Sequence, residues 1–277
     1  MKKQKIILSF LCAVLVGSIM AFPLLISKVI QQDEKPVLTA QNTVVQYDRV
    51  EIPAKLTDRK EQIIEHCGYM VSYNSEWKIP NWVAYELTKE EVEGVTPRGK
   101  DFVPDPEVKG ATATTEDYKN SGWDRGHLAP AADMKWSKQA MTESFYLSNI
   151  CPQNHNLNGG VWKDLEERVR SYALQHGRLY VVCGPIVDTS YSTIGENKVA
   201  VPSAFFKVLL QNTQNQWSAI AFVFPNQSGR KPLSSYTLTV NELQKITHID
   251  FFPTLPDSIE NAIENTIDLD KWEFFLN

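Results

Sequence analysis

The sequence predicts an α+β fold with a mainly antiparallel central sheet. Three observations support this fold class. Runs rich in β-branched and aromatic residues recur along the chain, and polar turns separate them, as expected for strands. A few other segments carry the apolar spacing that is typical of helices. The two kinds of segment do not alternate regularly, so the repeated strand–helix–strand units of a parallel sheet are not predicted.

The first 30 residues differ from the rest of the chain. Three lysines near the start precede an uncharged apolar stretch from Ile6 to Ser27. A basic start followed by an apolar stretch is typical of a secretory signal, and this stretch is also long enough to span a bilayer. Two interpretations of residues 1–30 therefore stay open, a cleaved signal peptide and an uncleaved signal-anchor. Either one predicts export, giving a periplasmic, secreted or outward-facing anchored domain that meets the membrane only through an uncleaved segment.

Residues 31–48 are polar and show neither a helical nor a strand period, which predicts a linker. The remaining residues, 49–277, are enough for one domain with a substantial core. The formal net charge of the chain is −5. Residues 1–30 hold four lysines and no acidic residue, so the rest has 24 basic and 33 acidic side chains, a net charge of −9. Nucleic-acid binders are usually basic, so tight non-specific affinity for nucleic acid is not predicted.

Much of the negative charge lies at the C-terminal end. Residues 241–277 hold eight acidic residues against two lysines. We expect this segment to lie away from any site that binds phosphate groups, because its carboxylates would repel them. The rest of the domain is only mildly acidic, so a few local arginines are sufficient to bind phosphate there.

Three cysteines follow the predicted linker, namely Cys67, Cys151 and Cys183. An odd number cannot form a complete disulfide framework. Cys67 and Cys183 lie in apolar, strand-like runs, which favours buried free thiols over the alternative of one disulfide. The chain has no Cys-x-x-Cys pair, so a cysteine zinc site is not predicted.

Strands are predicted at six places in the domain. The first two, His66–Tyr73 and Asn81–Leu87, are rich in aromatic and β-branched residues and flank a polar turn. Between Glu90 and Gly122 the chain is rich in glycine, proline, threonine and charge, which predicts a long loop. Loops of this length in compact domains are usually functional. The later strand-like runs are Phe145–Ile150, followed by a predicted loop from Cys151 to Leu157, and then Leu179–Val187, Ala200–Leu210 and Trp217–Pro225.

Helices are predicted at four places. Ser137 caps a short one, Thr239 and Glu242 form the capping box of another, and a third begins at Asp257. The best-defined helix runs from about Gly159 to Gln175. Its apolar residues recur at helical spacing, and they are Val161, Trp162, Leu165, Val169, Tyr172 and Ala173.

A histidine beside an arginine stands out in the stretch Ser121-Gly-Trp-Asp-Arg-Gly-His-Leu-Ala-Pro130, which predicts a short polar turn. This stretch places His127 close to the permanently charged Arg125. Farther along, Asn158 begins the long helix near the middle of its apolar stripe. Glu166 lies roughly 80° away around that helix, and Arg170 roughly 120° away. A general base, a phosphate clamp and a metal ligand are the groups that phosphodiester hydrolysis needs.

Each of these residues also has a purely structural interpretation. Asn158 could serve only as the N-cap of the long helix. Glu166 and Arg170 are spaced i,i+4, so they could form a simple surface ion pair. Arg125 could pair with its acidic neighbour, and His127 could be a partly buried histidine whose hydrogen bonds are satisfied.

An ordered set of motifs separates these interpretations. The motifs are Asp124-Arg-Gly-His127, Tyr146-Leu-Ser-Asn149, Pro152-Gln153, Leu157-Asn158, Trp162, Leu165-Glu166, Ala200-Val-Pro-Ser-Ala-Phe-Phe-Lys207, Val223-Phe-Pro-Asn226, Leu238-Thr-Val-Asn-Glu242, Asp250-Phe-Phe-Pro253 and Leu255-Pro256. Together they resemble the DNA/RNA non-specific endonuclease family, the ββα-metal group with secreted bacterial sugar-non-specific nucleases and mitochondrial endonuclease G. The resemblance covers about residues 60 to 265, and it implies a ββα-metal finger active site within the α+β fold.

The resemblance implies a role for each residue of the finger. His127 would be the general base, and Asn158 would be the sole direct protein ligand of one Mg²⁺, with Mn²⁺ as a substitute. Glu166 would act on the ion through metal-bound waters. Arg125 and Arg170 correspond to family arginines around the scissile phosphate, where they would take part in catalysis and bind the substrate.

Three features depart from the family pattern or align with it only loosely. Arg98, in the long loop, stands where the family has a further substrate-binding arginine, but that stretch aligns loosely. The segment 154–156 and the pair Gly159-Gly160 differ in detail from the family. These departures affect the expected loop geometry rather than the expected chemistry.

The residues and the resemblance together predict a Mg²⁺-dependent, sequence-non-specific endonuclease that hydrolyses phosphodiester bonds of DNA and RNA and leaves 5′-phosphate ends. A base and a metal that touch only phosphate and water cannot readily distinguish sequences or sugars. Two alternatives stay open, an exported phosphodiesterase restricted to small substrates and a non-catalytic nucleic-acid-binding module. The chain lacks a Gly-x-Ser-x-Gly elbow, so a serine hydrolase is not predicted. The sequence indicates neither a preference between DNA and RNA nor an oligomeric state.

Overall fold

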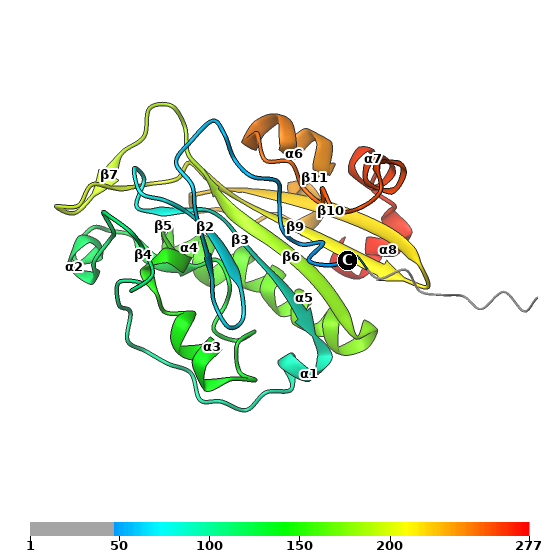
Figure 1. Ribbon diagram of the computed structural model, residues 1–277, viewed down its shortest axis with the longest axis horizontal. Coiled ribbons are helices and arrows are strands. Elements are labelled where there is room, and N and C mark those ends of the chain that lie inside the picture. The colour runs from blue at the N-terminus through cyan, green and yellow to red at the C-terminus, as the bar shows by residue number, and fades with distance from the viewer. Residues whose placement is uncertain (1–46, 277) are drawn as a thin grey trace, which may run out of the picture. The chain divides into compact units, whose positions relative to one another are not determined.

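The structure is a computed structural model that describes residues 47–276 (Figure 1). The predicted signal or anchor over residues 1–30 lies outside the described residues, as does nearly all of the predicted linker over residues 31–48. Within the described part of the chain, no helix combines the length and the apolar character that crossing a bilayer requires.

An antiparallel sheet of seven strands forms the centre of the described chain. The strand order is β1-β2-β3-β6-β9-β10-β11, and every neighbouring pair is antiparallel. The predicted α+β class with a mainly antiparallel central sheet is therefore confirmed. The strands are β1 (Gln62–Glu65), β2 (Met70–Asn74), β3 (Ile79–Thr88), β6 (Arg178–Ile186), β9 (Ala204–Thr213), β10 (Gln216–Pro225) and β11 (Thr237–Leu238).

Two smaller antiparallel sheets lie outside the central one. In the first, β4 (Asp124–His127) pairs with β5 (Ile150–Gln153), and His127 stands opposite Ile150. In the second, β7 (Thr193–Ile194) pairs with β8 (Val199–Ala200). The polar turn that the sequence predicts around His127 is wrong, because residues 124–127 form the strand β4. A four-residue strand that contains glycine and three polar residues lacks the apolar alternation by which strands are recognised.

The predicted strand Phe145–Ile150 and the loop predicted after it are also wrong. Residues 147–149 form a short 3-10 turn, in which the amide of Asn149 donates to the carbonyl of Tyr146 at 2.9 Å. The strand begins only at Ile150, inside the segment that was expected to be loop. The apolar run is buried by this turn rather than by a sheet, and a short apolar run does not distinguish the two.

The helices differ from the predictions mainly at their ends. The cap at Ser137 is confirmed, because its hydroxyl accepts from the amides of Gln139 and Ala140. The capping box of Thr239 and Glu242 is confirmed as well. The helices are α1 (Lys89–Val92), α2 (Thr115–Tyr118), α3 (Lys138–Glu143), α4 (His155–Leu157), α5 (Lys163–His176), α6 (Val240–Thr247), α7 (Asp257–Asn265) and α8 (Leu269–Leu276).

The predicted long helix is preceded by α4 and interrupted by a wide π-type turn over residues 158–162. Asn154 is the N-cap of α4, because its side-chain oxygen accepts from the amides of Asn156 and Leu157. Gly160 leaves the helical conformation at φ −112° and ψ −120°. Asn158 has helical angles and stands at the C-terminal end of α4, so the purely structural interpretation of Asn158 as an N-cap is wrong.

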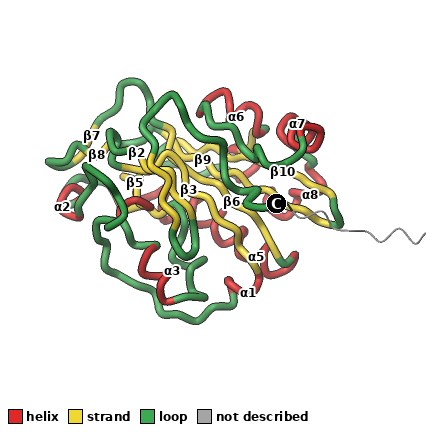
Figure 2. Tube along the Cα trace, in the orientation of Figure 1, coloured by secondary structure: helices red, strands yellow, loops and turns green. Residues whose placement is uncertain are grey.

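Helices cover both faces of the central sheet, and each face has its own core (Figures 1 and 2). On one face α5 packs against β3 and β6, while on the other α6 and α7 pack against β10. Successive side chains of β9 point to opposite faces, so Phe205 belongs to the α5 core and Phe206 to the α6–α7 core. Each large apolar side chain buried in this way stabilises the fold by about 1.5–3 kcal/mol.

Candidate active site

Two elements carry the predicted site residues, the β4–β5 hairpin and the helical segment that ends in α5. β4 holds Arg125 and His127, and its partner β5 packs in the same core as α5. Asn158 begins the wide turn before α5, and α5 itself holds Glu166 and Arg170. This gives the strand–strand–helix order that the motif resemblance implies.

One glycine and one asparagine fix the strand that ends at His127. A Cβ at Gly126 would clash with the side chain of Gln153 on β5, so the hairpin can close only over a glycine. The side chain of Asn149 accepts from the amide of Ala129 at 2.9 Å and donates to the carbonyl of the same residue at 2.9 Å. The amide and the carbonyl of Ala129, two residues after His127, are therefore both bonded by one side chain, which fixes the backbone there.

The imidazole of His127 packs against two aromatic rings that also contact each other. Its centroid is 5.3 Å from that of Phe102 and 4.9 Å from that of Phe145, which meets it edge-on. The Nε2 atom is buried and has no hydrogen-bond partner among residues 47–276. Burial, together with the positive charge of Arg98, lowers the pKa of His127 to about 3. The ring is therefore neutral near pH 7 and able to accept a proton.

Asn158 is oriented by an acidic neighbour on β4. Its Nδ2 donates to Oδ2 of Asp124 at 2.9 Å, and Nδ1 of His155 lies 3.0 Å from the same oxygen. This contact fixes which end of the amide is the donor, and it leaves Oδ1 of Asn158 without a protein donor in the described chain. An amide oxygen held in this way is a suitable ligand for a hard cation such as Mg²⁺.

Arg125 and Asn158 line the same cavity, which has a volume of about 630 Å³. The Arg125 guanidinium lies over the ring of Phe102, 4.5 Å from its centroid. The Arg98 guanidinium lies 5.4 Å from the centroid of Phe145. The other lining residues are Lys100, Asp101, Phe102, Thr115, Glu116, Tyr118, Lys119, Trp123 and Asp124, and none belongs to the acidic segment 241–277.

Glu166 and Arg170 are close in space, but they do not form the i,i+4 ion pair considered from the sequence. Arg170 donates instead to Oδ1 of Asp133 at 2.8 Å, and Asp133 is fully buried. Burial raises the pKa of Glu166 to about 7, and Lys207 and Arg170 oppose that rise. The surface-bridge interpretation is therefore wrong, since Arg170 is held inside the domain by a buried carboxylate.

Two buried charged residues of this region were not identified from the sequence. Asp133 accepts a second hydrogen bond, from the hydroxyl of Tyr85 at 2.9 Å. Lys207 is fully buried, and its Nζ lies 4.4 Å from the centroid of Trp162 without a hydrogen-bond partner in the described chain. A lysine inside the apolar run of β9 was the one available signal, because charged residues are almost never fully buried without a reason.

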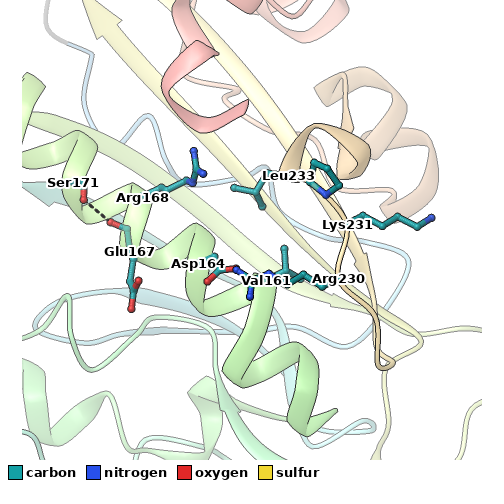
Figure 3. A pocket seen from close by; sticks show the side chains of 9 residues that line it. Val161, Asp164, Glu167, Arg168, Ser171, Arg230, Lys231 and Leu233 are labelled. Carbon is teal, nitrogen blue, oxygen red and sulfur yellow. Dashed lines mark hydrogen bonds and ion pairs between the residues drawn. The ribbon is translucent and has the colours of Figure 1, made fainter. Parts of the chain in front are cut away.

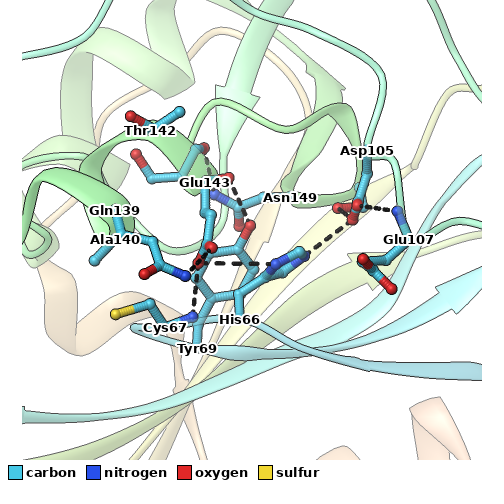
Figure 4. Close-up of polar contacts among 12 residues, drawn as sticks. His66, Cys67, Tyr69, Asp105, Glu107, Gln139, Ala140, Thr142, Glu143 and Asn149 are labelled. Atoms are coloured by element: carbon cyan, nitrogen blue, oxygen red, sulfur yellow. Dashed lines mark hydrogen bonds and ion pairs between the residues drawn. The ribbon is translucent and has the colours of Figure 1, made fainter.

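A buried polar network holds the long loop that carries Arg98 and Phe102 (Figure 4). Oδ2 of Asp105 lies 2.9 Å from Nε2 of His66 and accepts from the hydroxyl of Ser148 at 2.5 Å. These bonds tie the loop to the central sheet and to the turn before β5. The region predicted as a single loop between Glu90 and Gly122 also contains α2 and the end of α1. The hydrogen bonds of Asp105 nevertheless hold the middle of this region in place.

A second hollow of about 590 Å³ lies on another face of α5 (Figure 3). Asp164 and Arg168 line it, and Arg230 pairs with Asp164 at 2.7 Å. At 100° per residue these side chains of α5 point roughly opposite to Glu166. None of the predicted site residues lines this hollow, so it is separate from the site built around Asn158.

All three cysteines within the described chain are free. Cys151 and Cys183 are buried, whereas Cys67 is exposed. The predicted burial of Cys67 is wrong, because the residue lies in the turn between β1 and β2 rather than inside a strand.

The family model described as DNA/RNA non-specific endonuclease matches residues 46–258. Nuclease EXOG, mitochondrial, from Mus musculus is 36% identical over 70% of this chain and 57% of its own length. Endonuclease G, mitochondrial, from Bos taurus is 34% identical over 70% of each chain. Nuclease C1 from Cunninghamella echinulata is 32% identical over 69% of this chain and 83% of its own.

A similar fold occurs in a solved complex, described as EndoG with EndoGI and the mechanism of EndoG inhibition. It has a TM-score of 0.67 and 29% sequence identity, and the match covers 72% of this chain and 89% of that one. The match to the EXOG relative, in contrast, spans little more than half of that relative's length.

The relatives correct the predicted location. The EXOG and endonuclease G relatives are named mitochondrial, which points to mitochondria and contradicts the prediction of an exported, secreted or membrane-anchored domain. That prediction rested entirely on residues 1–30, which lie outside the described residues. A basic start followed by an apolar stretch is common to several kinds of targeting segment, so charge and hydropathy alone do not name the destination.

Proposed function

The chain belongs to the DNA/RNA non-specific endonuclease family, and we propose that it is a metal-dependent endonuclease that cleaves DNA and RNA without sequence specificity. The observation that carries this proposal is the state of His127. Its neutral ring has an unpartnered, buried Nε2 and packs on Phe102, which lines the cavity together with Arg125 and Asn158.

His127 acts as the general base. It accepts a proton from the attacking water, whose oxygen bonds to phosphorus while the bond from phosphorus to O3′ breaks. The departing O3′ takes up a proton, so one fragment ends in a 3′-hydroxyl and the other in a 5′-phosphate. A positioned base of this kind contributes about 10²–10⁴-fold to the rate.

The residues near Asn158 fit a Mg²⁺ ion, with Mn²⁺ as a substitute. Asn158 offers an amide oxygen that no donor of the described chain occupies, and Glu166 offers a carboxylate on the same helical segment. Mg²⁺ keeps several of its waters and needs few protein ligands, so Asn158 would hold it directly and Glu166 would act through water. When bound, the ion supplies charge neutralisation to the phosphate and the departing oxygen.

Arginines near His127 hold the phosphate. Arg125 is exposed at the cavity, and Arg98 approaches from the long loop. Arg170 retains donors beyond the one that it gives to Asp133, and these are available to a phosphate oxygen. Contacts to phosphate carry no information about the base or the sugar, which accounts for low sequence specificity.

The test of the proposed function is a cleavage assay on three substrates. The purified protein is incubated with supercoiled plasmid, with structured RNA and with a small phosphodiester such as bis-p-nitrophenyl phosphate, each with Mg²⁺ and with EDTA. We expect Mg²⁺-dependent cleavage of plasmid and RNA that EDTA abolishes, with 5′-phosphate ends. Cleavage of the small substrate alone would replace the endonuclease by a restricted phosphodiesterase, and binding without any cleavage would leave a non-catalytic module.

A further inference from the structure

Three carboxylates converge on the face of the sheet opposite α5. Asp250 follows α6, and Glu260 and Glu264 lie one turn apart on α7, so they share one side of that helix. One oxygen from each residue lies within 4.8 Å of one oxygen from each of the others. These residues belong to the acidic C-terminal segment, to which the proposed function assigns no role.

No cationic side chain among the described residues forms an ion pair with these three carboxylates. Glu264 is only 7% exposed, and its Oε1 is buried without a hydrogen-bond partner in the described chain. Its Oε2 accepts one bond, from Nε2 of Gln244 at 3.0 Å. A buried carboxylate oxygen that faces two other acids without a donor is costly unless an ion from solution joins it.

Electrostatics of the folded chain point the same way. Burial, together with the charges of Glu260 and Asp250, raises the pKa of Glu264 to about 7. The pKa of Glu260 is also raised, by burial and by Asp250. The protein alone therefore pushes a proton onto this cluster, and a divalent cation would remove the same repulsion more effectively.

We propose that Asp250, Glu260 and Glu264 bind a divalent cation of the calcium class, separate from the ion at Asn158. Ca²⁺ binds oxygens at about 2.3–2.6 Å, so two oxygens on one ion are at most about 5 Å apart, which accommodates a separation of up to 4.8 Å. Mg²⁺ binds at about 2.0–2.1 Å and demands near-ideal octahedral geometry, which three carboxylates from two segments meet less readily than the flexible shell of Ca²⁺. Waters complete the shell of six to eight ligands that Ca²⁺ prefers.

The ion would join α7 to the segment that follows α6. That segment is held independently, because the backbone carbonyl of Asp250 accepts from the amide of Ala54 at 2.9 Å, and Oε1 of Gln244 accepts from the amide of Phe251 at 2.8 Å. These oxygens are already occupied, so the three carboxylates supply the protein ligands. The role is structural, because binding here stabilises the α6–α7 layer against the far face of the sheet.

Thermal unfolding with Ca²⁺ tests the proposal. The purified protein is stripped with EDTA, dialysed and unfolded at pH 7.5 over a range of Ca²⁺ concentrations. At about 100 times the dissociation constant, we expect the midpoint to rise by roughly 5–10 °C. The same rise should occur in Asn158→Ala, which lacks the other metal ligand, and in Asp270→Asn, a control within the same acidic segment but outside the cluster.

The cluster variants give the decisive outcomes. Asp250→Asn and Glu264→Gln should lose the Ca²⁺-dependent rise, and Ca²⁺ titration of the Asn158→Ala protein by calorimetry should show one site. Asp250 is exposed, so its variant folds even if a change at buried Glu264 does not. The proposal is overturned if Ca²⁺ leaves the wild-type midpoint unchanged, if the Asp250→Asn midpoint rises as much as that of wild type, or if Asn158→Ala loses the rise.

Discussion

The two faces of the central sheet differ in whether a cation pairs with their buried carboxylates. On the α5 face, Asp133 is fully buried, but it pairs with Arg170 and accepts from the hydroxyl of Tyr85. On the α6–α7 face, Glu264 is nearly as buried and meets Asp250 and Glu260, with no ion pair in the described chain. The comparison teaches that the protein's own cations fix the geometry of one face, whereas the other face keeps negative charge for an ion from solution.

The largest effect is expected at the base on the α5 side of the molecule. His127→Ala should lower plasmid and RNA cleavage by about 10²–10⁴-fold, because the ring that accepts the proton is lost. Rates at saturating Mg²⁺ measure the effect, and thermal unfolding checks that the fold persists. His248→Asn is the matched control at the end of α6, where the backbone has φ +55° and asparagine is tolerated. Equal rates for the two variants would remove His127 from the mechanism.

The next effect concerns the buried ion pair. Arg170→Met should lower the free energy of unfolding by about 3–5 kcal/mol, because it leaves Asp133 charged, buried and without its cation. Lys163→Met is the control on the same helix. Its partner Glu167 is exposed, so the loss there should be below about 1 kcal/mol. Urea unfolding of both variants measures the difference, and similar losses would show that the α5 face is not fixed by its internal charges.

A smaller effect separates two asparagines of the same helical segment. Asn158→Ala should raise the Mg²⁺ concentration for half-maximal cleavage by about 10-fold or more, with little change in stability, because the Asn158 side chain is not the N-cap of a helix. Asn154→Ala should lower the free energy of unfolding by about 1 kcal/mol, since Asn154 is the cap of α4. Metal titration and urea unfolding of both variants decide the matter. The assignment fails if Asn158→Ala loses stability while its metal titration is unchanged.

The smallest effect is a dependence on pH at the far face. The folded pKa of Glu264 is raised to about 7 above its usual 4.5, so the folded state binds more protons between these values. Stability from this group is therefore lost as the pH rises from 4.5 through 7. Without Ca²⁺, Glu264→Gln should be more stable than wild type above pH 7, on the order of 1 kcal/mol, and nearly equal below pH 4.5. A variant that is less stable at pH 8 would contradict the unpaired charge.

Features with a local signal were predictable from the sequence. Capping chemistry predicts two helices, one at Ser137 and one at Thr239 and Glu242. The long apolar runs predict strands of the central sheet. The helical spacing also brought Glu166 and Arg170 to one side of α5. The ordered motifs also identify the family without any information on geometry.

Features that depend on tertiary pairing were not predictable. The polar strand β4 exists because Gly126 admits the side chain of Gln153, a contact that no local pattern reveals. Arg170 pairs with Asp133 rather than with Glu166, because the buried carboxylate of Asp133 is the stronger partner. The burial of Lys207 against Trp162, and the convergence of Asp250 with α7, likewise arise only when distant segments pack together.

On the α5 side of the molecule, general-base catalysis requires the imidazole of His127 to be neutral. The most direct measurement is an NMR titration of the protein with isotopically labelled histidine, in which His127→Gln assigns one of the five imidazole signals. Because burial lowers the pKa of His127 to about 3, its signal should not titrate between pH 8 and pH 5. A His127 signal that titrates near the ordinary value of about 6.5 would contradict the account.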